Sequence, residues 1–323
     1  MIQQPETVGS TLVATAARGG LSPALPAAAI AFALALLAAL PAFLGAYGLS
    51  VALQILSMVA LTQSWVAFSG MTGYASLGYA AFYGLGAYVV AVFWQTVPLW
   101  LLLPAAGLAA GLLALVFGYI ALRVRGPYFV ILTLGIAEFV KYVVVAIEAA
   151  AGSSGRLLFG GPAPSVLYWI MLGLAVAATA LTWAIRRSRF GVGLRTIRED
   201  ETAAVTIGVP AARLKTIAFT LSTVIPGMVG AVWVLRSTYF DPEQMFSPAT
   251  SFSVITMAII GGSDSPVGAI LGAVFVGLLS TLLWSTAPQL YMVILGVLLV
   301  VFILFIPEGL YGRASSLIER MRR

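Results

Sequence analysis

The sequence predicts an all-α polytopic membrane protein with about ten transmembrane helices. Hydrophobic residues make up 61% of the chain and charged residues only 9%, whereas charged residues make up about 25% of a typical soluble domain. Apolar runs of about 20 residues, the length that crosses a bilayer as a helix, recur along the chain. The basic residues that give a net charge of +6 lie at the ends of these runs. They therefore indicate orientation in a lipid bilayer and not a nucleic-acid surface.

The predicted elements follow in order. Residues 1–23 lack the basic cluster of a secretory signal, so we expect a retained first span after this segment. The sixth and seventh runs are separated by a long polar loop, residues 186–215. Residues 24–306 form the transmembrane domain, whose apolar runs are 23–44, 46–68, 76–95, 98–121, 128–148, 165–185, 216–236, 250–262, 267–285 and 289–306.

The basic clusters predict the topology. The run 250–262 is short for a span, yet only if it crosses do all clusters fall on one side of the membrane. Ten crossings then place both the segment 1–23 and the tail 307–323 in the cytoplasm. The clusters that share this side are 123–125, 186–215 and 313–323.

Two Gly-rich stretches, 69–87 and 261–273, interrupt the apolar runs. Broken helices in membranes occur where backbone is buried in protein or lines a cavity. Small residues four apart, as in Gly107-x-x-x-Gly111 and Gly268-x-x-x-Gly272, let helices approach closely, so we expect these pairs to be packing faces.

Residue types that are absent exclude several kinds of chemistry. The chain has no Cys and no His, which removes thiolate nucleophiles, disulfides and the commonest metal ligands. Its two lysines, Lys141 and Lys215, do not follow glycine, so a Walker A motif is absent. We therefore expect no enzyme, no catalytic residue, no metal and no cofactor in this chain; ATP and Mg would be bound by a partner.

The polar loop 186–215 contains the predicted functional helix. Thr196 and Glu199 have the spacing of a capping box, which predicts a helix that begins at Ile197. Gly208 is a good C-terminal stop for that helix. One face is predicted to be small and smooth, with Ile197, Ala204, Ile207 and Gly208. The alternative is a solvated loop helix whose charges only fix the topology.

This loop resembles the cytoplasmic coupling motif of bacterial ABC importer permeases. It is most similar to the high-affinity branched-chain amino-acid importers, and to their M-type inner-membrane permease. The general signature reads Glu-Ala-Ala-x-x-x-Gly, and here Thr202 separates the Glu from the two Ala. The resemblance assigns coupling to an ATPase subunit to Arg198, Glu199, Asp200, Glu201, Ala203, Ala204 and Gly208.

Further motifs extend the resemblance over about residues 50–312. Residues 76–82 match Ser-Leu-Gly-His-Ala-Ala-Phe with Tyr79 at the His, and 123–129 match a segment ending in Arg-Gly-Pro-Tyr-Phe. In the late motif, Asp264 and Ala269 stand at a Gly and a Pro. The first motif supplies candidates for lining a pathway, with core packing as the alternative: Ser76, Gly78, Tyr79 and Phe82.

The resemblance implies a type II-like ABC importer permease fold in the bacterial inner membrane. The chain would form half of a pathway in a heterodimer with a second permease subunit. Two cytoplasmic ATPase subunits would drive it, and a periplasmic substrate-binding protein would deliver branched-chain or related amino acids. Urea, short amides and small aromatic acids are alternative substrates within the same machinery. From another class, the alternative is an ion-coupled secondary transporter that works alone.

Glu138 and Lys141 are ionisable residues midway along the run 128–148. At i,i+3 spacing they can form an ion pair on one helix face. A proton relay is the alternative, since ionisable groups inside membranes are often functional. Glu148 ends the same run, where we expect it to need no buried partner.

Overall fold

A computed structural model describes residues 24–286, 290–306, 309–313 and 316. The predicted segment 1–23 and most of the predicted tail 307–323 lie outside these residues. The chain falls into two compact units, residues 1–43 and 44–323. The described part of the first unit is helix α1, Ala24–Phe43, with Pro41 in its last turn.

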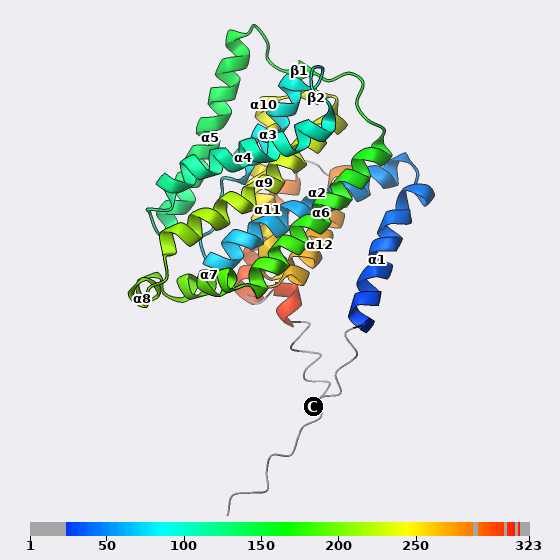
Figure 1. Cartoon of the computed structure of the whole chain (residues 1–323). Coiled ribbons are helices and arrows are strands. Elements are labelled where there is room, and N and C mark those ends of the chain that lie inside the picture. The colour runs from blue at the N-terminus through cyan, green and yellow to red at the C-terminus, as the bar shows by residue number, and fades with distance from the viewer. Residues whose placement is uncertain (1–23, 287–289, 307–308, 314–315, 317–323) are drawn as a thin grey trace, which may run out of the picture. The chain divides into compact units, whose positions relative to one another are not determined.

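The second unit is a helical bundle, apart from one pair of two-residue strands (Figure 1). A helix occupies each of the ten apolar ranges predicted from the sequence. The elements of this unit are α2 (Ala46–Trp65), the π-helix η1 (Val66–Gly70), α3 (Tyr79–Phe93), α4 (Leu99–Ala121), α5 (Pro127–Ala150), β1 (Arg156–Leu157), α6 (Pro164–Arg187), α7 (Arg189–Glu199), α8 (Glu201–Thr206), α9 (Ala211–Ser237), β2 (Tyr239–Phe240), α10 (Pro242–Met245), α11 (Pro248–Gly261), α12 (Pro266–Thr286) and α13 (Tyr291–Phe305).

Among the described residues, seven helical segments are long and apolar enough to cross a membrane. Helices α3 and α11 are shorter, with 15 and 14 residues. The seven segments are Ala46–Gly70, Leu99–Ala121, Pro127–Ala150, Pro164–Arg187, Ala211–Ser237, Pro266–Leu283 and Val293–Arg313.

Glycine sets the closest helix contacts. A Cβ added at Gly86 of α3 would overlap the carbonyl oxygen of Gly227 in α9, and one at Gly230 would overlap that of Tyr83. Such backbone-to-backbone contact is the way small residues bring membrane helices together. Gly107 faces Met228 of α9. These contacts make α9 the central support of α3 and α4.

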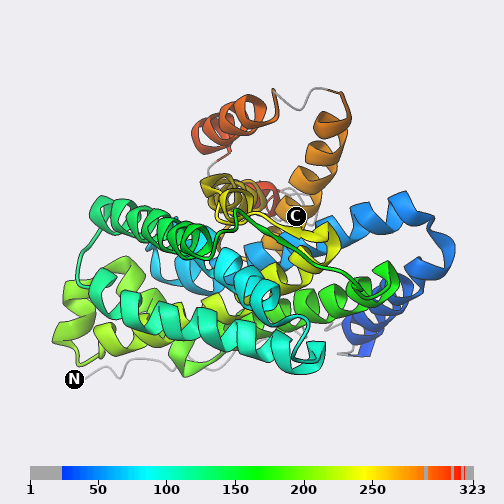
Figure 2. The same cartoon turned by 90° about the horizontal axis from the view of Figure 1, so that it is seen from above.

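The second predicted glycine pair packs as expected. Gly268 and Gly272 of α12 lie directly against α11, where added Cβ atoms would meet the backbone of Gly261. The prediction of a packing face is therefore confirmed here. Seen from above, α12 and α13 lie on the edge of the bundle opposite to α4 (Figure 2).

An aromatic cluster forms the core between η1, α3, α5 and α9. The ring of Phe219 lies 5.0 Å from that of Phe68 and 5.6 Å from that of Phe82, both edge-on. Leu194 and Ile197 of α7 complete this core and are 0% and 3% exposed. Burying each of these two side chains stabilises the fold by about 1.5–3 kcal/mol. The polar loop is therefore packed against the bundle.

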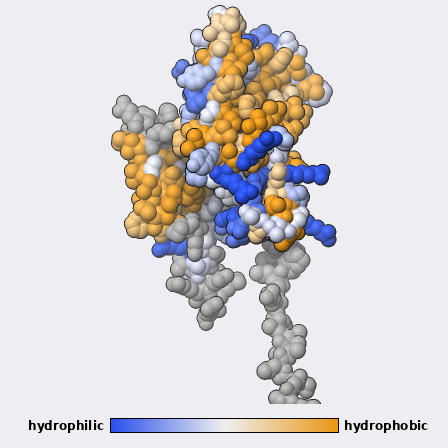
Figure 3. Space-filling view, turned by 90° about the vertical axis from the view of Figure 1, so that its left-hand side faces the viewer, coloured by the Kyte–Doolittle hydropathy of each residue, from blue (hydrophilic) through white to orange (hydrophobic). Residues whose placement is uncertain are grey.

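The two ends of the bundle differ in chemistry. One end carries residues 188–208, which we call the elbow: α7, Asp200 and α8 (Figure 1). The other end carries the β1–β2 pair, in which Arg156 lies opposite Phe240. Figure 3 shows long hydrophilic side chains concentrated over the lower part of one face, below a mostly hydrophobic surface.

Candidate functional site

The elbow consists of two helices and not the single helix that the sequence predicted. Helix α7 begins at Arg189, where the Ser188 hydroxyl oxygen accepts a hydrogen bond from the Gly191 amide at 3.1 Å. The predicted start at Ile197 is wrong. The Thr196 hydroxyl donates to the carbonyl of Val192 inside α7, 3.1 Å away, so it caps nothing.

The break lies at Asp200. Its backbone is extended, with φ −155° and ψ 110°, and its Oδ1 accepts from the amides of Thr202 at 2.7 Å and Ala203 at 3.0 Å. Asp is a strong N-cap residue because its carboxylate satisfies amides that a first helical turn leaves free. Asp200, which the sequence predicted to lie inside a single helix, is therefore the N-cap of the second helix, α8.

Helix α8 ends as the sequence predicted. The amide of Gly208 donates to the carbonyl of Val205 at 3.0 Å, and Gly208 has a φ of +90°. A glycine with positive φ just after a helix is the usual C-terminal cap. The predicted stop at Gly208 is confirmed.

The break also changes which residues share a face. Ala204 is 0% exposed and packs with Ile197 against the core of this chain. Ile207 and Val205 point outward instead and are 74% and 52% exposed. The prediction of one smooth face with Ile197, Ala204, Ile207 and Gly208 is therefore wrong, since the turn at Asp200 sends the first two inward.

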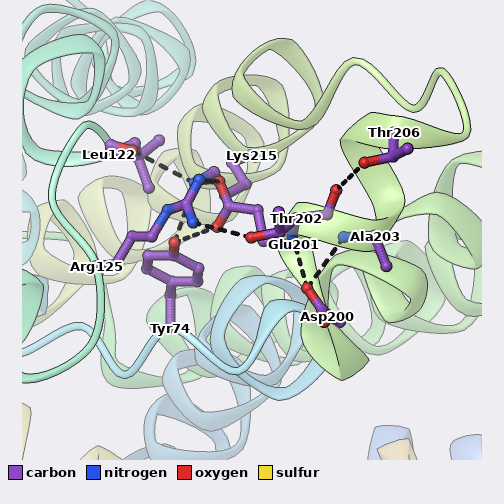
Figure 4. A network of polar contacts seen from close by, with 9 residues as sticks. All are labelled: Tyr74, Leu122, Arg125, Asp200, Glu201, Thr202, Ala203, Thr206 and Lys215. Carbon is purple, nitrogen blue, oxygen red and sulfur yellow. Dashed lines mark hydrogen bonds and ion pairs between the residues drawn. The ribbon is translucent and has the colours of Figure 1, made fainter.

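Glu201 is the centre of a polar network that ties the elbow to three other segments (Figure 4). Its Oε1 lies 2.7 Å from Nζ of Lys215 on α9 and 3.5 Å from Nη2 of Arg125. Its Oε2 accepts a hydrogen bond from the hydroxyl of Tyr74. Lys215 also donates to the Tyr74 hydroxyl oxygen at 3.1 Å and to the carbonyl of Leu122 at 3.4 Å. A buried charge persists only when paired and hydrogen-bonded in this way.

The network changes the titration of its members. Burial alone would raise the pKa of Glu201, but the hydrogen bonds from Lys215 and Tyr74 and the charges of Lys215 and Arg125 hold it below its usual value. Burial and the hydrogen bond to Glu201 both raise the pKa of Tyr74. Glu201 is thus a fixed anion that anchors the first turn of α8 to α9, and Tyr74 stays a neutral donor.

Comparison with known proteins places this chain in a family. Residues 45–303 match the family described as "Branched-chain amino acid transport system / permease component". The chain belongs to this permease family. It is 30% identical over 275 residues to the high-affinity branched-chain amino acid transport system permease protein LivM of Escherichia coli (strain K12). That alignment covers 75% of this chain and 64% of LivM, so this chain spans just under two thirds of that relative.

Two more relatives are also named as permease proteins. The chain is 24% identical over 273 residues to LivH of Salmonella typhimurium, another permease protein of the branched-chain system, with 76% of this chain and 87% of LivH covered. It is 26% identical over 239 residues to the L-arabinose ABC transporter permease protein AraH of Azospirillum brasilense, with 72% and 68% covered. No solved structure matches the chain. The family and the apolar helices identify a multi-pass membrane protein of the permease family.

The other coupling residues predicted for this permease differ in what their side chains contact. Glu199, Asp200 and Ala203 lie on the exposed side of the elbow. Arg198 instead points back into the permease, where its Nη1 donates to the carbonyl of Gly70 at 2.8 Å and forms an ion pair with Asp264. Within the described residues no group of three or more Asp, Glu, His or Cys is placed to hold a metal.

The predicted pathway residues lie inside this chain. Ser76, Gly78, Tyr79 and Phe82 are all buried. The Tyr79 hydroxyl donates 3.0 Å to the carbonyl of Ser64 and lies 3.0 Å from the Ser222 hydroxyl. In the isolated permease they are core residues, and their role in a pathway stays a prediction.

Glu138 and Lys141 lie together on α5, with Nζ of Lys141 2.6 Å from Oε2 of Glu138. Their side chains are 31% and 15% exposed, in a segment long enough to cross a membrane. Each neutralises the other, as a charged group in an apolar setting requires.

Lys141→Met alone is expected to lower the yield of folded permease, because it leaves the Glu138 carboxylate without a cation in an apolar setting. The double variant Glu138→Gln with Lys141→Met should recover most of that yield. Size-exclusion chromatography in detergent measures both. Normal yield but lost transport in the double variant would instead make the pair functional.

Sequence reasoning missed the partner of Glu148. The expectation that Glu148 needs no buried partner is wrong, since its side chain is 1% exposed and receives the Arg156 Nη2 at 2.8 Å and the Tyr88 hydroxyl at 3.0 Å. The cause is the β1–β2 pairing, which folds the loop after α5 back over the helix end. The available signal in the sequence was a basic residue, Arg156, eight positions after Glu148. Only the folded chain shows that the two side chains are close.

Proposed function

We propose that this permease is one transmembrane subunit of a bacterial ABC importer for branched-chain or related amino acids. It forms half of the pathway with a second permease subunit in the inner membrane. Two cytoplasmic ATPase subunits that bind ATP and Mg drive the cycle, and a periplasmic binding protein delivers the substrate. The names of its relatives, two of them permeases for branched-chain amino acids, support this choice.

The elbow is the proposed docking element for an ATPase subunit, and one observation carries this. Val205 on α8 and Ile207 directly after it are exposed apolar side chains at the polar end of the bundle, next to exposed polar residues. An apolar tip with a polar rim is the usual composition of a protein interface. The Glu201 network and the buried Ala204 hold the tip rigidly, so a force applied there reaches α9.

The charges inside the helices favour this function over an ion-coupled transporter. In the part of the chain that the structure describes, both carboxylates of α5 have a cationic partner: Glu138 has Lys141 and Glu148 has Arg156. A secondary transporter needs a carboxylate that is free to take up and release an ion.

Ile207→Asp and Val205→Asp should each weaken binding of the ATPase subunits. Placing a charge at the centre of an interface costs about 2 kcal/mol or more, which is about a 30-fold loss of affinity. Both side chains are exposed, so the permease itself should still fold. Co-purification of ATPase subunits and ATP-driven leucine uptake in proteoliposomes with the binding protein are the measurements.

Gln244→Asp, an exposed change at the other end of the bundle, is the control and should retain the ATPase subunits. Full assembly and uptake in both elbow variants would refute the docking assignment. Urea, acetamide and benzoate serve as competing substrates for leucine. Uptake by the chain alone, driven by a proton gradient, would point to the secondary transporter instead.

The proposed topology has ten crossings with both termini in the cytoplasm. Because the chain has no Cys, single cysteines can be introduced without background. Cysteines at Ser188 and Ser316 should react with a membrane-impermeant maleimide only after the membrane is opened, and one at Gln244 should react in intact spheroplasts. Reaction of Ser316→Cys in intact spheroplasts would mean an odd number of crossings after the elbow.

A further inference from the structure

Arg198 connects three segments that are far apart in the sequence. It lies in the last turn of α7, and its Nη1 donates to the carbonyl of Gly70, the last residue of η1, at 2.8 Å. The same nitrogen forms an ion pair with Asp264 in the turn between α11 and α12. A cation at the C-terminal end of a helix also meets the negative end of the helix dipole.

The two loops that Arg198 holds are also in direct contact. A Cβ added at Gly70 would overlap the carbonyl oxygen of Ser263. Gly73 has a φ of +74°, and a Cβ there would lie 3.2 Å from Cγ of Arg198. The two Gly-rich stretches, 69–87 and 261–273, therefore meet at Arg198. The missing side chains of Gly70 and Gly73 leave the space that this contact needs.

The Arg198–Asp264 pair is too exposed to serve mainly as a structural brace. Its side chains are 36% and 68% exposed, and exposed ion pairs contribute little to stability. The backbone joins the elbow to α6 and α9, and Glu201 ties it to Tyr74, Arg125 and Lys215, but none of these contacts reaches the turn that holds Asp264. Arg198 adds a link from the elbow to the ends of η1 and α11.

We propose that Arg198 and Asp264 form a latch through which the elbow positions the ends of η1 and α11 during transport. This inference rests on the proposed function and adds an internal role for Arg198, which faces the permease and not the docking tip.

The test uses the complete importer, with both permeases, the ATPase subunits and a leucine-loaded binding protein, in proteoliposomes. Asp264→Ala, a change outside the elbow, should assemble normally and hydrolyse ATP, and Arg198→Ala removes the other partner of the same pair. The leucine taken up per ATP hydrolysed should fall about fivefold or more, the lower end of typical coupling between sites. The charge exchange Arg198→Asp with Asp264→Arg should restore part of this ratio. A purely structural role would instead lower the yield and melting temperature of the single variants and leave the ratio of the assembled complex unchanged.

Arg195→Ala is the matched control, since Arg195 lies exposed on the same helix and donates to the Arg186 carbonyl at 3.4 Å. It should leave the ratio unchanged. Unchanged ratios in both Arg198→Ala and Asp264→Ala would overturn the latch, and so would loss of ATPase subunits from Arg198→Ala alone. Failure of the unaltered complex to couple ATP hydrolysis to leucine uptake would instead count against the proposed function.

Discussion

Lys215→Met is expected to prevent most of the permease from folding. The Lys215 side chain is 2% exposed and forms a 2.7 Å ion pair with Glu201, which is itself 13% exposed. Removing one partner of a buried pair leaves an uncompensated charge and typically costs about 3–5 kcal/mol. Thermal unfolding in detergent, followed by tryptophan fluorescence, measures the loss, and Lys215→Met with Glu201→Gln should regain much of it.

Arg125→Met provides the contrast in the same network. Arg125 lies 3.5 Å from Glu201, but its side chain is 60% exposed, so its loss should cost less than about 1 kcal/mol. An equal loss in both variants would show that the network does not depend on burial of Lys215.

The same network predicts a dependence of stability on pH. The folded-state pKa of Glu201 is below its ordinary value, so its contribution is complete above that ordinary value and disappears as the pH falls through the folded-state value. In Glu201→Gln the loss of stability on the acid side should therefore be smaller. Equal acid sensitivity of both proteins would contradict this assignment.

Gly86→Leu is the second change with a large expected effect. Gly86 of α3 faces the carbonyl oxygen of Gly227 in α9, and any side chain there must push the two helices apart. Overpacking commonly costs about 1–3 kcal/mol and occasionally more. The upper end or beyond is expected here, because the obstacle is backbone and cannot rotate away. Yield and melting temperature in detergent are the measurements.

Gly135→Leu is the matched control. Gly135 lies within α5, and a Cβ there meets nothing within 4 Å. Leucine in place of a helical glycine should stabilise the helix slightly or change nothing. If Gly86→Leu were tolerated as well as this control, the close crossing of α3 and α9 would not be a determinant of the fold.

The local sequence pattern was sufficient to predict the positions of the apolar helices. Apolar runs long enough to need internal hydrogen bonding predicted where the ten apolar helices of the described residues lie, and small residues four apart predicted the packing faces of Gly107 and Gly268. The stop at Gly208 was also readable, because a cap depends on the residues beside it.

The sequence by itself determined that the chain is helical, apolar and a member of a permease family, with a polar loop between its sixth and seventh apolar runs. Tertiary structure decided which residues of that loop face outward. The sequence predicted a cap at Thr196, but Asp200 caps α8 in the folded chain, where Leu194, Ile197 and Ala204 are buried in the core. The tertiary structure also decided the ion-pair partners of Lys215, Arg156 and Arg198. An ion pair between distant segments depends on how the fold brings their backbones together, and the periodicity of the sequence gives no information about that distance.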